Sequence, residues 1–317
     1  DFGGGWTDVP PYTEREGGSV CNVAITRYAT ATVATGGHLA VRSHQPNSLD
    51  DRLIRAALRH SRLPGVEARL ESDYPLGAGL GGSSAAGVAL AGALSVLTGA
   101  PRDPHALATL SRSIEVDELG LAGGFQDHFA AAYGGALLLT FGATIEVERI
   151  GLSVETQADF ARRAILVYTG ESRVSGDTIL AVRNSYLAGE PRVVDALARM
   201  KSLALDMAAA LRADDLDALG ALVGEHWTHQ RALHPSITTP RIDAIVETAT
   251  RAGALGTKAL GASGGGCVLA IAAKGCEDQL ARALAPLGEQ LTYAIDTTGF
   301  DVLALLEGHG SLDAHQR

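Results

Sequence analysis

Two periodic patterns of apolar and polar residues divide the chain into strands and helices. Strict alternation over residues 66–71 predicts a half-exposed strand, whereas apolar residues spaced three and four apart within 49–63 predict a helix. The same patterns predict strands at 19–25, 29–35, 66–71, 136–141, 164–168, 258–262, 267–272 and 291–296. They predict helices at 49–63, 83–97, 105–119, 126–133, 177–187, 193–211, 216–233, 240–252 and 277–284.

The order of these elements favours an α+β fold. Strands and helices follow one another without the regular strand–helix–strand rhythm of a doubly wound parallel sheet. The 317 residues correspond to about two domains of ~100–200 residues each. We expect the division near 150–165, which gives one domain over 1–160 and a second over 161–317. Gly36-Gly37 predicts a hairpin turn.

Composition and charge exclude several classes of protein. Hydrophobic residues make up 46% and charged residues 20%, as in a globular protein rather than a disordered one. No apolar run approaches the roughly 18 residues of a membrane-spanning helix, and no secretory signal is visible. The net charge of −10 argues against a nucleic-acid partner. Three cysteines without a C-x-x-C spacing fit neither a disulfide framework nor a zinc site, and they favour a reducing cytoplasm.

Glycine is in marked excess, with 38 residues, about 12% against about 7% on average. Residues 77–84 are Gly-Ala-Gly-Leu-Gly-Gly-Ser-Ser, which matches G-x-G-x-x-G without the context of a dinucleotide site. The preceding strand alternates in polarity instead of being buried on both faces, and Pro75 interrupts the junction. The P-loop pattern fails too, because Ser83-Ser84 stand where Lys-Ser/Thr is required.

What remains is a glycine loop that runs into a helix opening with two serines. Glycines let the backbone approach a phosphate, and the free N–H groups and dipole of a helix start attract the anion. A serine hydroxyl at this place can also ligate Mg²⁺. The alternative is a glycine-rich turn whose serines cap the helix.

Three motifs resemble those of the GHMP kinases, the family of galactokinase, homoserine kinase, mevalonate kinase and phosphomevalonate kinase. Residues 75–86 resemble the P-x-x-x-G-L-G-S-S-A-A motif, with the extra glycine of the sugar-kinase branch. Residues 260–267, Leu-Gly-Ala-Ser-Gly-Gly-Gly-Cys, resemble the C-terminal glycine motif. Residues 1–8, Asp-Phe-Gly-Gly-Gly-Trp-Thr-Asp, resemble the N-terminal sugar-binding motif. The resemblance therefore covers nearly the whole chain.

The resemblance implies a fold, ligands and a site. The N-terminal half should resemble ribosomal protein S5 domain 2, the C-terminal half should be ferredoxin-like, and the active site should lie in the cleft between them. ATP and Mg²⁺ are implied as nucleotide and metal, with Ser84 as one metal ligand. The residues implied to hold ATP are Gly77, Gly79, Leu80, Gly81, Gly82, Ser83 and Ser84.

Two acidic residues match further catalytic positions of the family. Asp127 matches the aspartate that lies against the substrate hydroxyl; from the residues alone, an N-terminal helix cap is the alternative. Glu115 matches the metal-binding glutamate, whereas Asp117 and Glu118 fit a solvated face. His128 points about 100° away from its neighbour in a helix, so packing is expected, with a role as base as the alternative.

The resemblance also implies substrate contacts. The expected residues are Gly4, Gly5, Thr7, Asp8, Gly264 and Gly265. Asp8 would accept sugar hydroxyls; a turn before Pro10 is the alternative. Arg173 is the candidate for the distal phosphate of a sugar phosphate, because Arg binds phosphate bidentately, and a surface Arg is the alternative. Arg241 and His234 are weaker candidates.

The motifs point to two branches of sugar kinases. Residues 4–11, followed by Glu-Gly-Gly at 16–18, resemble fucokinases. Residues 126–135, 167–173 and 235–243 resemble D-glycero-D-manno-heptose 7-phosphate kinases, although Phe125 and His128 depart from both branches.

The leading expectation is therefore an ATP-dependent kinase that phosphorylates the anomeric C1 hydroxyl of D-glycero-D-manno-heptose 7-phosphate in nucleotide-sugar biosynthesis. An L-fucose-type sugar 1-kinase is the alternative, followed by a non-catalytic regulator that binds ATP and sugar. The motif at 3–8 argues against a non-sugar alcohol such as homoserine or mevalonate. The expected partner is a small-molecule sugar or sugar phosphate, with no nucleic acid, no membrane and a homodimer left open.

Overall fold

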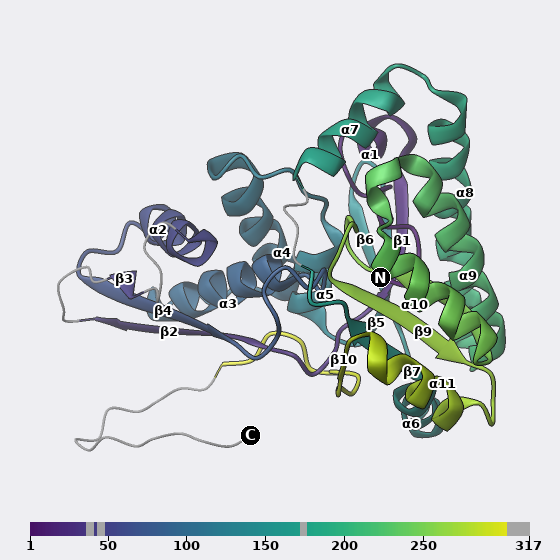
Figure 1. The fold of residues 1–317 in the computed structure, drawn as a ribbon. Helices are drawn as coiled ribbons and strands as arrows, with labels where there is room; N and C mark the ends of the chain where they lie inside the picture. Colours follow the sequence, from purple (N-terminus) through teal and green to yellow (C-terminus); the bar gives the residue numbers. More distant parts are fainter. Residues whose placement is uncertain (36–40, 43–47, 172–175, 303–317) are drawn as a thin grey trace.

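The computed structural model describes residues 1–35, 41–42, 48–171 and 176–302. The turn predicted at Gly36-Gly37 and the candidate Arg173 lie outside the described residues. Three β-sheets and the helices that cover them form an elongated molecule (Figure 1). One sheet and its helices form an arm on the left of this view, and the second half of the chain forms most of the body on the right.

A three-stranded antiparallel sheet lies between the arm and the body. Its order is β1 (Gly18–Val23), β5 (Ala136–Phe141) and β6 (Ile145–Ile150). Because side chains alternate between the two faces of a strand, β1 and β5 contribute to two cores. Val20 and Leu139 pack with helix residues such as Phe129, whereas Cys21 and Leu138 face the body.

The arm is a sheet covered by two helices. Its strands are β2 (Ala29–Thr35), β4 (Val66–Ser72) and β3 (Val41–Arg42), with β4 in the middle, antiparallel to β2 and parallel to β3. Helices α2 (Leu49–Ser61) and α3 (Gly82–Leu97) bury Leu53, Ile54, Leu90 and Leu94 against it. The arm therefore fixes the direction of α3, whose first turn follows the glycine loop.

The helix predicted at 105–119 is helical in the structure, but its last part is a π-helix instead of an α-helix. α4 (Pro104–Arg112) passes directly into a π-helical segment, η1 (Ser113–Glu118), and α5 (Gln126–Tyr133) follows. π-Helical turns are rare and often lie at functional sites. The widened turn of η1 carries Glu115, while Ile114 stays in the arm core.

The second half of the chain builds a four-stranded antiparallel sheet. Its spatial order is β10 (Glu289–Leu291), β7 (Ala164–Tyr168), β9 (Cys267–Ala272) and β8 (Ala254–Ala259). In chain order this is fourth, first, third and second, with helices in the first and last connections, as in ferredoxin-like folds. The first connection contains α7 (Gly176–Leu187), α8 (Pro191–Arg212), α9 (Leu216–Leu233), η2 (Pro235–Ile237) and α10 (Pro240–Arg251), and the last contains α11 (Glu277–Leu284) and η3 (Ala285–Leu287).

Two predicted strands differ from those observed. The strand expected at 258–262 is β8, which ends at Ala259 because the chain turns at Gly261, where φ is +62°. The strand expected at 291–296 is limited to β10, because the chain beyond it leaves the sheet and pairs with residues 24–27 through Thr26 and Asp296. Six elements were not predicted: α1 (Tyr12–Glu16), β3, β6, α6 (Val154–Arg163), η2 and η3.

One core joins the two halves of the chain. It contains Cys21 and Leu138 of the central sheet, Leu203 and Met207 of α8, and Leu269 of β9. The predicted α+β fold with a ferredoxin-like second half is confirmed. The predicted boundary at residue 160 falls within α6, between the central and C-terminal sheets, and stays a prediction.

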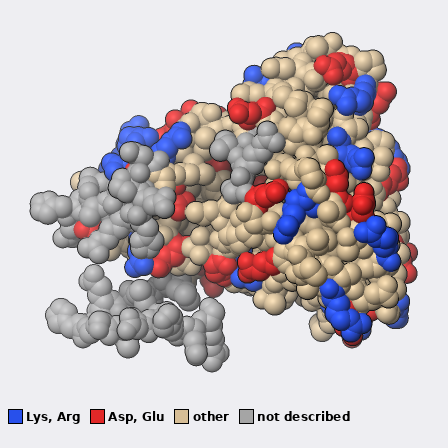
Figure 2. Space-filling view, in the orientation of Figure 1, with Lys and Arg blue, Asp and Glu red and all other residues tan. Residues whose placement is uncertain are grey.

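Two surface properties complete the fold. No helix among the described residues is long and apolar enough to span a bilayer. On the face shown in Figure 2, acidic and basic side chains are interspersed over the body rather than sorted into a broad basic patch.

Candidate active site

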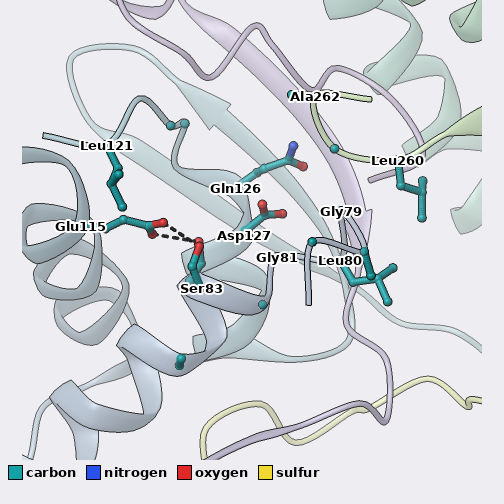
Figure 3. Close-up of a pocket in the computed structure, with 18 of the residues that line it drawn as sticks. Gly79, Leu80, Gly81, Ser83, Glu115, Leu121, Gln126, Asp127, Leu260 and Ala262 are labelled. Carbon is teal, nitrogen blue, oxygen red and sulfur yellow. Dashed lines mark hydrogen bonds between the residues drawn. The ribbon is translucent and has the colours of Figure 1, made fainter. Parts of the chain in front are cut away.

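A cavity of about 510 Å³ lies where the arm, the start of α5 and the segment after β8 meet. Its walls come from residues 77–84, η1, the start of α5, the N-terminal loop and the segment at 260–265. This volume is typical of a small-molecule site. Figure 3 shows Glu115 pointing toward Ser83, with Asp127 and Gln126 projecting from α5.

The glycine loop offers free backbone amides to this cavity. Gly77, Gly79 and Gly81 have φ of +72°, +71° and +73°, a conformation that side chains disfavour. Within the described residues, no backbone N–H from Gly79 to Ser84 donates to a protein acceptor. The free N–H groups of a helix start, together with the helix dipole, form an arrangement that binds phosphate.

The loop has no room for larger residues at three of its glycines, and a Cβ at Gly79 would lie 2.9 Å from the Leu260 carbonyl oxygen. A Cβ at Gly81 would lie 2.9 Å from Cγ of Asp127, so the loop backbone rests on this carboxylate. A Cβ at Gly82 would collide with the ring of Tyr74, whose hydroxyl donates to the Gly82 carbonyl at 2.8 Å. The glycines therefore give the loop its curvature and also let Asp127 and Tyr74 lie against its backbone.

The C-terminal glycine motif supports this loop from the other half of the chain. Gly261, with φ of +62°, faces the backbone of Gly79, and a Cβ at Gly266 would lie 2.7 Å from the carbonyl oxygen of Ala78. The N–H of Gly266 donates to the Glu171 carbonyl, and the N–H of Cys267 donates to the Ala78 carbonyl, at 2.7 and 2.8 Å. Much of this motif is therefore used to join segments of the protein.

Glu115 and the two serines form an oxygen-rich site at the start of α3. The Ser83 hydroxyl donates to Oε1 of Glu115 at 2.6 Å, and the Ser84 hydroxyl donates to Oε2 at 3.3 Å. Burial would raise the pKa of Glu115, but hydrogen bonds from His128 and the serines outweigh it and leave the pKa below its ordinary value. The rivals Asp117 and Glu118 are exposed, and Glu118 pairs with arginine and histidine side chains of α2.

These oxygen donors fit Mg²⁺. Such ions are often held by one or two carboxylates, hydroxyl oxygens, substrate phosphates and water. Among the described residues, no group of three or more His, Cys, Asp or Glu side chains could hold a metal alone. A metal at Glu115, Ser83 and Ser84 would therefore need ligands from a bound nucleotide.

Asp127 lies beside the glycine loop and does not cap its own helix. α5 begins without a side-chain cap, and Asp127 is its second residue. Burial raises the pKa of Asp127, and the neighbouring carboxylate of Asp8 raises it further. A carboxylate with a raised pKa that lies beside a cavity is suited to accept a proton from a substrate hydroxyl.

Asp8 lines the cavity and also holds the start of α5. Its Oδ2 accepts hydrogen bonds from the N–H groups of Phe125 and Gln126 at 2.8 and 2.9 Å. A Cβ at Gly124 would collide with this carboxylate, which explains the glycine before the helix. Burial raises the pKa of Asp8, although the two backbone donors oppose the shift.

The predicted substrate residues divide into two groups. Gly5, Asp8 and Gly265 line the cavity, as do all seven residues of the predicted ATP loop with Glu115 and Asp127. Gly4, Thr7 and Gly264 make structural contacts: the Gly4 N–H donates to Nε2 of His226, the Thr7 hydroxyl bonds the Gly4 and Ser19 carbonyls, and the Gly264 N–H donates to the Ile237 carbonyl.

The structure adds cavity residues that sequence reasoning missed. They are Asp1, Trp6, Tyr74, Gln126, His226, Gln230 and Ser263. Asp1 and Gln126 are joined through Oδ2 and Nε2, and the other oxygen of Asp1 pairs with the buried Lys258 ammonium at 2.5 Å. Trp6 and Gln126 lie inside quoted motifs and could have been found there, whereas His226 and Gln230 lie on α9, far from any motif.

The described lining of the cavity is acidic. It contains carboxylates from Asp1, Asp8, Glu115 and Asp127, with Asp50 and Glu71 toward the arm, but no Lys or Arg. A polyanion such as ATP would meet repulsion here unless a divalent cation accompanied it. The negative charge of the lining and the oxygen atoms of Glu115 and the serines therefore both favour a divalent cation at this site.

Comparison with known proteins assigns the chain to a family. The fold and the site define an α+β protein with free backbone amides at a helix start that lines a cavity. The family model for the GHMP kinases N terminal domain matches residues 50–135, and the model for the GHMP kinases C terminal matches 207–289. Together these stretches cover more than half of the chain. The chain belongs to the GHMP kinase family.

Individual relatives are distant. The chain is 25% identical over 306 residues to a bifunctional fucokinase/GDP-fucose pyrophosphorylase of Arabidopsis thaliana, which covers 86% of this chain but only 29% of that protein. It is 25% identical over 286 residues to a D-glycero-alpha-D-manno-heptose 7-phosphate kinase of Campylobacter jejuni, covering 83% and 84% of the two chains. The crystal structure of a D-glycero-D-manno-heptose 1-phosphate kinase from Bacteroides thetaiotaomicron has the same fold, with a TM-score of 0.74, 21% identity and 96% of each chain covered.

Proposed function

We propose that this chain is an ATP-dependent kinase that transfers a phosphoryl group to the anomeric C1 hydroxyl of a sugar. The observation that carries the proposal is the convergence of three features in one cavity. Free amides line the start of α3, Glu115 and two serine hydroxyls form a cation site, and Asp127 lies against the same loop. Phosphoryl transfer needs this combination of positioning and charge neutralisation.

Each group has a role in the proposed reaction. The N–H groups from Gly79 to Ser84 bind the ATP phosphates and orient the terminal one. Glu115 and the serines would hold Mg²⁺, which would neutralise the phosphate charge. The carboxylate of Asp127 accepts a hydrogen bond from the C1 hydroxyl, orients its oxygen toward the phosphorus and takes the proton as the new P–O bond forms and the bond from the terminal phosphorus to the departing ADP breaks.

The leading substrate candidate is D-glycero-D-manno-heptose 7-phosphate. The heptose 7-phosphate kinase that the chain resembles is aligned over most of both chains. Such a substrate has a distal phosphate that needs a cation, and Arg173 is our candidate for it. Gly176, which follows Arg173 by three residues in the sequence, lines the cavity.

A neutral sugar of the L-fucose type is the second candidate, because of the charge of the site. The described lining contains no Lys or Arg that could meet a distal phosphate. It does contain Trp6, within the fucokinase-like motif, and amides and carboxylates suited to hydroxyl groups. The two candidates therefore differ in their dependence on Arg173.

A coupled ADP-release assay over matched sugars tests the proposal. The panel holds the heptose with and without its 7-phosphate, together with L-fucose, and ³¹P NMR locates the new phosphate. For a sugar phosphate substrate, Arg173→Ala should raise KM about 10–150-fold, the loss of one charge-assisted hydrogen bond. Equal effects on phosphorylated and free sugars would favour the neutral substrate, and ATP binding without ADP release on any sugar would favour a regulator.

Two further proposals concern the setting of the enzyme. The three cysteines are free, which supports a reducing cytoplasm as its location. The partner proposed is a small-molecule sugar or sugar phosphate, with the product entering nucleotide-sugar synthesis.

A further inference from the structure

His128 is a buried residue behind the cation site that the reaction above does not use. Its Nε2 lies 3.2 Å from Oε2 of Glu115 and 3.3 Å from Oγ of Ser84. Its Nδ1 lies 2.9 Å from Oγ of Ser111. The side chain of His128 is 3% exposed and that of Glu115 is 14% exposed. Glu115 therefore has one edge toward the cavity and another held from inside the protein.

The contacts of the ring determine which nitrogen donates to Glu115. A carboxylate oxygen can only accept, and the hydroxyl of Ser84 already donates to the same oxygen. When Nε2 carries the hydrogen of the ring, it donates that hydrogen to Glu115. On the other side, the hydroxyl of Ser111 can donate to Nδ1, or accept from it while donating to the Ser84 carbonyl at 3.3 Å. The hydrogen bond to Glu115 forms with a neutral ring in the first arrangement, and in the second it requires a hydrogen on both ring nitrogens.

These bonds connect four elements that meet only in the folded protein. Ser84 is on α3, Ser111 on α4, Glu115 on η1 and His128 on α5. A Cβ at Gly87 would collide with the hydroxyl of Ser111, so the glycine of α3 admits the serine that holds the ring. Both ring nitrogens of His128 are engaged, which leaves neither as a base for a substrate.

We propose that His128 is a positioning residue for the cation site, held in place by Ser111. It donates from Nε2 to Oε2 of Glu115 and so fixes the plane of the carboxylate, with Oε1 presented to Ser83 and the cavity. The inference rests on the proposed function, because it takes Glu115 as a metal ligand. Residues that orient metal ligands in this way typically change metal affinity 10–100-fold when they are replaced.

Direct binding of Mn²⁺ tests this role without turnover. Electron paramagnetic resonance of Mn²⁺ with a non-hydrolysable ATP analogue gives the metal affinity of the ternary complex. His128→Leu keeps the bulk of the side chain but no donor, and should weaken Mn²⁺ binding about 10–100-fold. His128→Gln retains an N–H donor that can reach Glu115, and should recover most of the affinity. Ser111→Ala frees the ring and should give a smaller loss.

Ser95→Ala is the matched control for Ser111→Ala. Ser95 is a buried serine too, but it is on α3 and its hydroxyl donates to the carbonyl of Gly92 in its own helix. This variant should bind Mn²⁺ like the wild type. In steady-state assays, the Mg²⁺ concentration for half-maximal activity should rise for His128→Leu more than kcat at saturating Mg²⁺ falls.

Three outcomes overturn the inference in distinguishable ways. Mn²⁺ affinity within twofold of wild type in a folded His128→Leu variant would reduce His128 to packing. Equal losses in the Leu and Gln variants would show that the donor is not what matters. Absence of Mn²⁺–nucleotide binding in the wild type would overturn the cation site itself, and with it both this inference and the proposed function.

Discussion

The two glycine clusters of this protein have similar compositions but different tasks. The segment at 79–82 keeps its amides free of protein acceptors and lines the cavity, whereas the segment at 261–266 donates amides to carbonyls of other segments and is largely buried. Gly79 and Gly261 meet backbone to backbone. In both segments glycine lets other parts of the protein approach closely, and in the first segment it also leaves the amides open to a ligand.

The comparison explains why the halves of the chain can share one site. The C-terminal motif supports the loop through the bond from Cys267 to Ala78, while the Asp8 carboxylate secures the α5 helix that carries Asp127. The loop itself can remain open because its curvature is supported from behind. Both segments are rich in glycine, and both contain glycines with positive φ. Composition alone therefore does not distinguish the open segment from the buried one.

The largest effect is expected from Gly81→Val in the open segment. The new side chain would enter the space of Asp127 and the path of the phosphates, and the residue would be strained at φ of +73°. Calorimetry and thermal shift should show no binding of ATP–Mg²⁺, which otherwise raises Tm by mass action. Gly99→Val is the control, because Gly99 has φ of +71° but nothing within 4 Å of a Cβ. Normal ATP binding by Gly81→Val would contradict the role of the loop.

A stability effect is expected from Gly266→Ala in the closed segment. Its Cβ would lie 2.7 Å from the Ala78 carbonyl oxygen at φ of +80°, and such strain costs about 1–3 kcal/mol. Urea unfolding should show a lower free energy of unfolding than for Gly275→Ala, which has φ of +88° but open space. ATP affinity should fall less than the stability does. Loss of ATP binding without loss of stability would contradict this difference, because it would give the second segment a role in binding as well.

A smaller effect is expected in the pH dependence of turnover. The pKa of Asp127 is raised by burial, whereas that of Glu115 is lowered by its hydrogen bonds. As pH falls, Asp127 therefore takes up a proton first and can no longer accept one from the substrate. The acidic limb of kcat at saturating ATP and Mg²⁺ should lie above the ordinary aspartate pKa of 3.8. A limb at that ordinary value would contradict the assigned environment.

Much of the site could be predicted because its residues are neighbours in the sequence. The glycine loop, Ser83 and Ser84 form one motif, and Glu115 and Asp127 follow it in the sequence at positions that match the family. β6 could also have been found, since Ile145-Glu-Val-Glu alternates. The π-helical turn could not, because its apolar spacing resembles that of an α-helix over so few residues.

The remaining residues depend on contacts between distant segments. His128 was expected to pack, and it does, but its bonds to Ser84 and Ser111 arise only where three helices meet. His226 and Gln230 reach the cavity because α9 packs behind the N-terminal loop. Local patterns report which face of an element is buried, not which polar partners it finds there.

The central claim is that Asp127 serves the transfer step while the open loop serves binding, and Asp127→Asn tests it most directly. Asn retains the shape but cannot take a proton, so kcat should fall by at least about 10²-fold. The Kd for ATP–Mg²⁺, measured beside it, should stay near that of the wild type, because the phosphates are held by the amides from Gly79 to Ser84 and the cation. Near-normal kcat in this variant would contradict the account and place the proton acceptor elsewhere.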